Sequence, residues 1–275
     1  MASASADITV IVLVGDEALH IERFLEKIAP LRPHRIFIIE SQRGDNTHEL
    51  ALSTAARLAL PVETVWHDWE GNQARQFNWA LDALEIATEW ILRLDADEYL
   101  YEDTIAELRE LVAPGALPAE VTSLSLSLSR HIFGGEIRHG RDIEIIRAFR
   151  RGAARYAATE MDEHLVITHG TNRKLRGKFV DHSLLPFAVW QQKHRDYAVR
   201  EAKMAIEGRC NANKKNYYRL PPYFRALAYF GIRYFLQLGF LDGLPGWRWN
   251  FWQALWYRWL VDREISRLKR KLDSH

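Results

Sequence analysis

Apolar and polar positions alternate in blocks along the first third of the chain, and the blocks predict strands and helices in turn. Four short runs rich in apolar and β-branched residues have the length of buried strands. These runs are Ile8–Val14, Arg35–Glu40, Val62–Trp66 and Trp90–Leu94. The segments between them carry apolar residues at helical spacing. They are Ala18–Ala29, Thr47–Leu60 and Gln73–Ala87. This alternation predicts an α/β fold with a mostly parallel sheet flanked by helices.

The pattern changes in the second half of the chain. Residues Val121–Ser129 alternate strictly between apolar and small polar side chains, which predicts a strand covered on one side. Ile143–Phe149 is a further strand candidate, and from about Leu185 the chain is predicted to be helical and rich in aromatic residues. We therefore expect a catalytic or binding domain over residues 1–184 and a helical extension over residues 185–275.

Polar residues follow each of the first four predicted strands. In parallel sheets, ligands bind at the carboxyl ends of the strands, so these side chains are expected to meet at one edge. The groups are Gly15-Asp16-Glu17, Glu40-Ser41, His67-Asp68 and Asp95-Ala96-Asp97. Their convergence predicts a binding site at that edge.

Asp95 and Asp97 stand two positions apart directly after the fourth strand, so both carboxylates can approach one cation. Mg²⁺ and Mn²⁺ prefer oxygen ligands and are commonly held by one or two carboxylates together with substrate phosphates. The alternative is that these acids cap a following helix. Their position at the end of the fourth alternating strand favours the metal.

Other side chains at the same edge are candidates for binding a nucleotide. Glu40 would accept a hydrogen bond from a base or ribose, and Asp16 and Asp45 would serve the same pocket. Gln73 and Gln76 begin a helix from which amides reach a pyrophosphate or a sugar. Helix capping is an equal alternative for Asp45, and solvent exposure is the alternative for each amide.

The sequence Asp162-Glu163-His164 sets two acids beside an imidazole. Such a group supplies a general base for an attacking hydroxyl, with Glu163 or Asp162 as the base and His164 assisting. A surface salt bridge with Arg155 or Arg173 remains an alternative. The guanidinium groups of Arg147 and Arg150 match phosphate geometry, although arginines on a strand edge are as often solvated.

Composition and charge narrow the class of protein. With 48% hydrophobic residues and 27% charged residues in 275, a packed core is expected, and the single cysteine, Cys210, favours a reducing compartment. The N-terminus lacks a basic region before its first apolar run, so no signal peptide is expected. Residues 182–275 carry 17 Lys and Arg against 7 Asp and Glu, a net charge of +10, whereas residues 1–181 carry 20 against 29, a net of −9. An anionic partner is therefore expected for the second half.

Two aromatic segments in that half, Tyr223–Phe240 and Trp247–Leu260, are interrupted by arginines and are too charged to span a membrane. Aromatic helices with arginine on the polar face lie in the membrane interface, and the basic tail Arg263–Lys271 would add attraction to anionic lipid. Packing on the first domain or in a dimer is the alternative. Nucleic acid is not the expected partner, because the aromatic residues lie in apolar, helix-like runs that favour lipid or core.

These motifs resemble the family 2 glycosyltransferases of bacterial surface-polysaccharide and lipopolysaccharide synthesis, over most of the chain. Gly15-Asp16-Glu17 is similar to the first nucleotide-contacting turn of that family, and Leu94–Glu98 to its metal motif. The loop Glu40–Thr47 is similar to the second-strand loop, with Glu40 in place of the usual Asp. Arg147–Gly152 and Met161–His164 resemble the acceptor-side motifs.

The resemblance implies a GT-A fold, a UDP- or GDP-sugar donor, Mg²⁺ or Mn²⁺, and inverting transfer by single displacement. It implies a lipid-linked saccharide acceptor and a peripheral position on the inner face of the cytoplasmic membrane. Glu163 is the favoured base, and Val14, Glu17 and Ala96 are expected to line the nucleotide-sugar site. A non-catalytic protein that binds nucleotide sugars or polysaccharide is the alternative function.

Overall fold

The computed structural model describes residues 5–157, 165–209 and 216–273. The chain divides into two compact units. The first comprises residues 1–129 and 142–184, and the second comprises residues 130–141 and 185–275. Residues 130–141 thus group with residues 185–275, whereas the sequence predicts one boundary, between residues 184 and 185.

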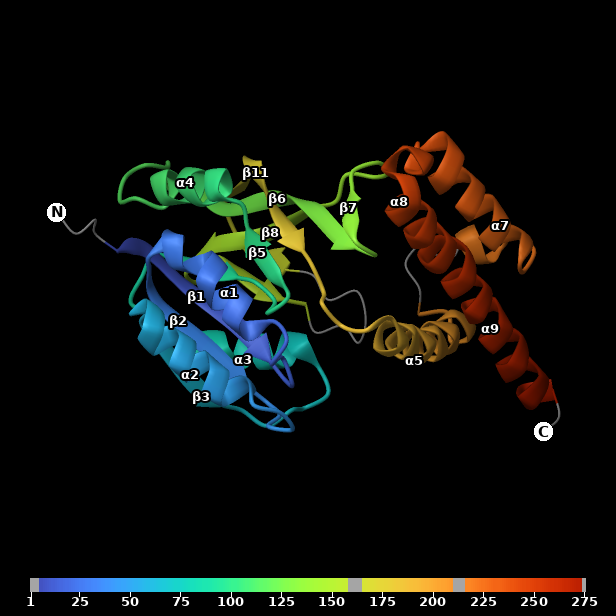
Figure 1. Ribbon diagram of the computed structural model, residues 1–275, viewed down its shortest axis with the longest axis horizontal. Coiled ribbons are helices and arrows are strands. Elements are labelled where there is room, and N and C mark those ends of the chain that lie inside the picture. Colours follow the sequence, from blue (N-terminus) through green and yellow to red (C-terminus); the bar gives the residue numbers. More distant parts are fainter. Residues whose placement is uncertain (1–4, 158–164, 210–215, 274–275) are drawn as a thin grey trace. The chain divides into compact units, whose positions relative to one another are not determined.

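The first unit is built on a mixed sheet with strand order β3-β2-β1-β4-β8-β6-β11-β5 (Figure 1). Its strands are β1 (Ala6–Val14), β2 (Pro33–Glu40), β3 (Val62–Trp66), β4 (Trp90–Arg93), β5 (Glu98–Leu100), β6 (Val121–Ile132), β8 (Glu144–Arg150) and β11 (Thr171–Asp181). The first four strands are parallel, whereas β8 runs antiparallel to both β4 and β6, and β11 to β5. The predicted α/β class and the four parallel strands are confirmed.

Helices cover both faces of this sheet. They are α1 (Ile21–Ile28) with the 3₁₀ turn η1 (Ala29–Leu31), α2 (Thr47–Leu58), α3 (Gln73–Ala83) and α4 (Glu102–Leu111). Alternate residues of β1 point to opposite faces: Val10 and Val12 join the core beneath α1, α2 and α4, and Ile11 joins the core beneath α3. Burial on both faces explains why the first strands are continuously apolar.

The prediction that β6 exposes its polar face is wrong. Ser123, Ser125 and Ser127 are buried together with the apolar residues between them. The neighbouring strands carry polar side chains that satisfy the serines: Ser125 donates to Glu144 at 2.5 Å and accepts from Asn172 at 2.8 Å. The alternation therefore separates an apolar interior face from a hydrogen-bonded one, because partners on β8 and β11 cover the serine face.

Two further strands, β9 (Ala154–Tyr156) and β10 (Leu165–Ile167), pair antiparallel in a small separate sheet. The second unit contains β7 (Gly135–Ile137), which forms a hairpin with the end of β6. Its other elements are α5 (Phe187–Ile206), α7 (Phe224–Gly231), the π-helical turn η2 (Ile232–Leu236), the 3₁₀ turn η3 (Gly239–Asp242), α8 (Gly243–Trp249), the π-helical turn η4 (Asn250–Trp256) and α9 (Tyr257–Asp273). The helical character predicted from Leu185 onward is confirmed.

Ion pairs hold the interior of the second unit together. Arg225 is buried and donates to Asp262 at 2.8 Å, and Arg258 donates to Glu201 at 2.8 Å. Tyr218 and Tyr257 also donate to Glu201. The expectation that these arginines form the polar face of interfacial helices is therefore wrong for Arg225 and Arg258, because buried carboxylates on α5 and α9 neutralise them.

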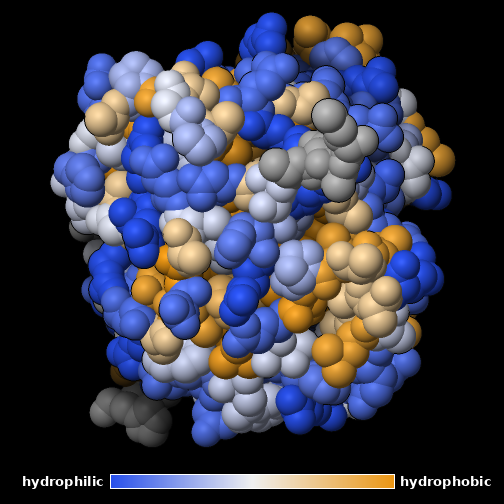
Figure 2. All heavy atoms as spheres, turned by 90° about the vertical axis from the view of Figure 1, so that its left-hand side faces the viewer, coloured by the Kyte–Doolittle hydropathy of each residue, from blue (hydrophilic) through white to orange (hydrophobic). Residues whose placement is uncertain are grey.

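Within the described residues, no helix is both long enough and apolar enough to cross a membrane. On the face drawn in Figure 2, hydrophilic side chains predominate and apolar side chains appear in smaller patches between them.

Candidate active site

The carboxyl end of β4 runs into a tight turn that contains the predicted metal ligands. The backbone N–H of Glu98 donates to the carbonyl of Asp95 at 2.9 Å, and the N–H of Asp95 donates to the Glu98 carboxylate at 3.0 Å. The turn leads into β5, and α4 begins only at Glu102. The alternative that Asp95 and Asp97 cap a helix is therefore wrong.

Asp97 lies in a concentration of negative charge. Burial raises the pKa of its carboxyl to about 6, and the negative charges of Asp181, Asp95 and Glu17 add to the rise. Asp181 ends β11 and is paired in register with Glu98. Acids from three different elements therefore face the end of β4, which is an environment that favours a bound cation.

The Asp95 carboxylate is fixed by its neighbour in β4. Arg93 donates to Asp95 Oδ1 at 2.9 Å, and the Arg93 guanidinium lies 5.1 Å from the centre of the Tyr156 ring. The side-chain amide of Asn78 holds the backbone of Tyr156. It donates to the Tyr156 carbonyl and accepts from the Tyr156 N–H, both at 3.0 Å. This chain of contacts connects the acidic turn to α3 and β9.

The turn after β1 is tied to the loop after β2. Asp16 accepts from the N–H of Gly44 at 2.7 Å, and the carbonyl of Val14 accepts from the N–H of Ser41 at 3.1 Å. A Cβ on residue 44 would lie 2.7 Å from an Asp16 carboxylate oxygen, so Gly44 is needed for this approach. The two predicted nucleotide-binding loops thus form one structure.

Asp45 fixes the turn that leads into α2 and ties it to the turn after β1. It accepts from the N–H of Thr47 at 2.9 Å, from the Thr47 hydroxyl, and from the N–H of Ala18 at 3.0 Å. Burial alone would raise the pKa of Asp45, but these hydrogen bonds outweigh it and lower the pKa. The N-cap of α2 is Asn46, so Asp45 does not cap the helix in the predicted sense; it fixes the turn that precedes it.

Glu17 and His20 form a pair at the start of α1. His20 Nδ1 lies 2.6 Å from Glu17 Oε2, and His20 Nε2 accepts from the N–H of Leu184 at 2.9 Å. Because Nε2 accepts, the ring proton is on Nδ1 and is donated to Glu17. The backbone N–H of Glu17 donates to the Thr47 hydroxyl at 2.8 Å, which ties the start of α1 to the start of α2.

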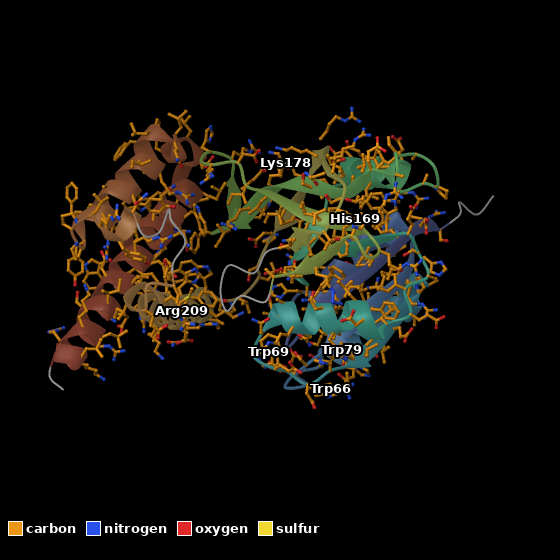
Figure 3. All side chains as sticks on the ribbon, turned by 180° about the vertical axis from the view of Figure 1, so that it is seen from behind. Trp66, Trp69, Trp79, His169, Lys178 and Arg209 are labelled. Carbon is orange, nitrogen blue, oxygen red and sulfur yellow. The ribbon has the colours of Figure 1, made fainter. Side chains whose placement is uncertain are left out.

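Glu40 is buried, with only 1% of its surface exposed, and its two carboxylate oxygens are occupied. Arg43 donates to one oxygen at 2.9 Å and His48 Nδ1 donates to the other at 2.6 Å. The Arg43 guanidinium lies 5.0 Å from the centre of the exposed Trp66 ring. Trp66, Trp69 and Trp79 lie in one region around β3 and α3 (Figure 3).

The two predicted glutamines differ in their surroundings. Gln73 is exposed. Gln76 is buried, and its amide nitrogen has no hydrogen-bond partner among the residues that the structure describes. Asn72 caps α3 by accepting from the N–H of Arg75 at 2.9 Å. A buried amide without a partner is costly, so Gln76 is the stronger candidate for a ligand contact.

The two predicted phosphate-binding arginines are both engaged elsewhere. Arg147 is buried in an ion pair with Glu98. Arg150 lies opposite Trp90, the first residue of β4, and donates to the carbonyl of Val121 at 2.8 Å. Arg150 is therefore at the amino end of β4, away from the acidic turn, and the structure does not bring it to the site.

Asp162, Glu163 and His164 lie outside the described residues, and so does Cys210. Ala96 is buried within the acidic turn.

Sequence reasoning missed several residues at the site. Asp181 could have been found, because it directly follows the apolar pair Phe179-Val180, just as Asp95 follows the apolar strand β4. The Arg43–Glu40 spacing of three residues was a weaker signal. No sequence signal pointed to Arg23. Its guanidinium donates to the backbone carbonyls of Asp97 and His182, and burial lowers its pKa.

No protein-family model matches the sequence, and no curated protein matches it. Among solved structures, the chain is similar to the mannosyltransferase PcManGT from Pyrobaculum calidifontis in complex with GDP-Man and Mn²⁺, at 15% identity over 98% of this chain and 76% of that one, with a TM-score of 0.49. It is similar to S. aureus TarS 1–349 in complex with UDP-GlcNAc, at 11% identity over 97% and 91% of the two chains, with a TM-score of 0.43. Glucosyl-3-phosphoglycerate synthase from Mycobacterium tuberculosis matches 46% of this chain and 44% of its own at 16% identity, with a TM-score of 0.33.

Proposed function

We propose that the chain is a metal-dependent glycosyltransferase that uses a nucleoside-diphosphate sugar of the UDP or GDP type. The observation that carries the proposal is the gathering of Asp95, Asp97 and Asp181 at the carboxyl ends of the strands, beside the joined loops after β1 and β2. This is the edge at which open α/β sheets bind nucleotides.

The donor set fits Mg²⁺ or Mn²⁺. All of its members are carboxylates, as hard divalent cations prefer. In the part of the chain that the structure describes, no three His, Cys, Asp or Glu side chains are close enough to hold a metal by themselves. An ion shared between two carboxylates and a diphosphate needs no third protein ligand. Asp95 and Asp97 would hold it, and it would neutralise the charge that develops on the departing diphosphate.

The chain's own residues would orient the donor. Arg93 fixes Asp95, and the Glu17–His20 pair stands beside Asp97. The unpartnered Gln76 amide would donate to an oxygen of the sugar or of the pyrophosphate. Glu40 would act on the nucleobase through Arg43 and His48, which its carboxylate holds in place.

Transfer would be inverting and would take one step. The acceptor hydroxyl attacks the anomeric carbon, the bond from that carbon to the diphosphate oxygen breaks, and the nucleoside diphosphate leaves with the electron pair. Glu163 would take the hydroxyl proton, with Asp162 as the second candidate and His164 assisting. In support, Tyr156, which precedes this segment, lies against Arg93 and so close to Asp95.

The acceptor would be a lipid-linked saccharide of bacterial surface-polysaccharide synthesis, reached from the inner face of the cytoplasmic membrane. Twelve large apolar side chains between residues 220 and 247 are exposed, and residues 182–275 have a net charge of +10. Exposed aromatic and aliphatic side chains on a basic unit suit the surface of an anionic bilayer. We call residues 220–247 the apolar segment.

Thermal unfolding with UDP, GDP, CDP and ADP, each with and without Mn²⁺, tests the donor site. A stabilising shift by one diphosphate that requires Mn²⁺ is expected in the wild type, in Glu110→Gln and not in Asp97→Asn. Glu110 is an exposed acid on α4 and serves as the matched control. If Asp97→Asn kept the Mn²⁺-dependent shift and full sugar transfer, the metal assignment would be wrong. Binding without turnover by the wild type would favour the non-catalytic alternative.

A further inference from the structure

The second unit contains an apolar pocket with one cationic side chain in its wall. Its volume is about 330 Å³, and it is lined by Phe133, Phe187, Arg248 and Trp252. All four residues belong to the second unit, so the pocket does not depend on the first. Its size is within the range of small-molecule sites, which are mostly apolar with a few polar groups that fix orientation.

Aromatic rings form the walls. Phe187 packs edge-to-face on Trp252, with ring centres 4.9 Å apart, and on Phe133, with ring centres 5.7 Å apart. Even so, 39% of Phe187 is exposed. Trp252 lies in the π-helical turn η4. Such turns interrupt regular helices and are frequent at functional sites.

Phe133 occupies its place at a conformational cost. It is the first central residue of the two-residue turn between β6 and β7, with φ of 55°, and Gly134 follows with φ of 86°. Positive φ at both positions defines a type I′ turn, in which Asn or Gly is preferred. A phenylalanine in this conformation is strained, and such strain is characteristic of binding sites.

Arg248 is the polar member of the pocket. It is exposed on α8 and has neither a hydrogen bond nor an ion pair with any described residue. Arg225 and Arg258 of the same unit are both neutralised by carboxylates. A guanidinium at an apolar pocket matches the oxygens of a phosphate.

We propose that this pocket binds the lipid phosphate of the acceptor, with the first part of the hydrocarbon chain among the aromatic rings and the phosphate on Arg248. This inference rests on the proposed lipid-linked acceptor. Leu244 and Trp247 on the same helix are exposed and would carry the continuing chain toward a bilayer. The pocket thus fits a ligand that is apolar at one end and doubly or singly anionic at the other.

Isothermal titration calorimetry with farnesyl phosphate, a soluble lipid phosphate, tests the site on the full chain. Saturable binding is expected, with farnesol about tenfold weaker because it lacks the charge-assisted contact. Inorganic phosphate is expected not to compete. Arg248→Gln should bind farnesyl phosphate no better than farnesol, whereas Arg195→Gln should match the wild type. Arg195 is exposed on α5 and outside the pocket.

Phe133→Asn separates binding from folding. Asn adopts positive φ readily, which offsets the lost packing of Phe133 on Phe187, so the variant should fold with about the stability of the wild type while binding about tenfold more weakly. Asp97→Asn should bind farnesyl phosphate normally. The pocket assignment is overturned if the wild type shows no saturable binding, or if neither Phe133→Asn nor Arg248→Gln weakens it. If instead Asp97→Asn binds the probe and retains transfer, the proposed metal site fails and the pocket stands.

Discussion

Glu98 and Arg147 form an ion pair inside the first unit, with their side chains only 6% and 5% exposed. Glu98 opens β5 and Arg147 lies in β8, and the Arg147 guanidinium also lies 4.5 Å from the centre of the Phe179 ring. The carboxylate of Glu98 accepts from the N–H of Asp95 as well. The pair therefore anchors the turn that presents Asp95 and Asp97, and this role accounts for Arg147 without a phosphate.

Removing one partner of this pair should be strongly destabilising. Burial raises the pKa of Glu98 to about 8, and Arg147 is the cation that opposes this rise most. Because Arg147→Met removes that cation, we expect a loss of about 3–5 kcal/mol in the free energy of unfolding. Arg35→Met is the control, since the exposed Arg35–Glu63 pair should contribute roughly 0–1 kcal/mol. Urea denaturation measures both. Equal losses in the two variants would contradict an anchoring role for Glu98 and Arg147.

Glu40→Gln should weaken donor binding more than it slows transfer. The neutral amide holds Arg43 and His48 less firmly, so the base-binding region loses its arrangement while Asp95 and Asp97 keep theirs. We expect the donor KM to rise about tenfold with kcat within about twofold. Steady-state kinetics with varied donor decide the point. A fall in kcat at unchanged KM would place Glu40 in the chemical step instead.

The parallel half of the fold was predictable because its strands are buried on both faces and are followed by helices of clear periodicity. The antiparallel half was not. The serines of β6 gave the same alternation as a half-exposed strand, since sequence spacing does not reveal that Asn172 and Glu144 supply their partners. Five of the eleven residues of β11 are charged, so its alternation of exposed and buried residues was missed, and Asp181 with it.

At the site, the sequence located the acidic turn and both loops correctly as neighbours, because the carboxyl ends of parallel strands must meet. The sequence did not predict which groups the arginines of β8 contact. Whether Arg147 meets a phosphate or Glu98, and whether Arg150 points to one end of β4 or the other, depends on the register of β8. That register is set by long-range packing. The same holds for Arg225 and Arg258, whose buried partners are far away in the chain.

Gly177→Ala should destabilise the first unit. A Cβ on residue 177 would lie 2.3 Å from the hydroxyl of Thr104, which is buried and donates to the carbonyl of Lys178. Strand β11 and helix α4 would have to separate, at a cost of about 1–3 kcal/mol. In Gly231→Ala, the new Cβ meets no atom within 4 Å, and the helical position should gain roughly 0.5–1 kcal/mol. Thermal unfolding of both variants checks the contrast, and a destabilised Gly231→Ala would contradict it.

The second unit should lose stability in mild acid because of His194. Burial lowers the pKa of this imidazole, and the nearby Arg130 lowers it further, against the hydrogen bond from its ring to the carbonyl of Trp190. Tyr197 and Tyr257 also pack on the ring. The unfolded chain therefore binds a proton at a higher pH than the folded chain does, so stability falls as pH drops below about 6.5. His194→Asn should reduce this dependence between pH 7.5 and 5.5 in denaturant titrations, and an unchanged slope would exclude His194 as its source.

Membrane binding should depend on the apolar segment. Leu236 and Phe235, in the turn η2, are 77% and 59% exposed. Leaving such large apolar side chains in water is unfavourable, so a bilayer that covers them would stabilise the bound state. Inserting a large apolar side chain into a bilayer contributes about 1.5–3 kcal/mol, so replacing both with glutamate should reduce vesicle binding at least tenfold. Leu52→Glu, at an exposed position on α2 in the first unit, is the matched control and should bind as the wild type does.

Co-sedimentation with vesicles containing anionic lipid would measure this difference. Binding should also weaken as salt is raised, because screening reduces the attraction of the net charge of +10 over residues 182–275 to the lipid headgroups. If the double glutamate variant and Leu52→Glu bound vesicles equally, the apolar segment would not be the contact. If the wild type bound vesicles equally well at any lipid charge and salt concentration, the basic residues would not contribute to membrane binding.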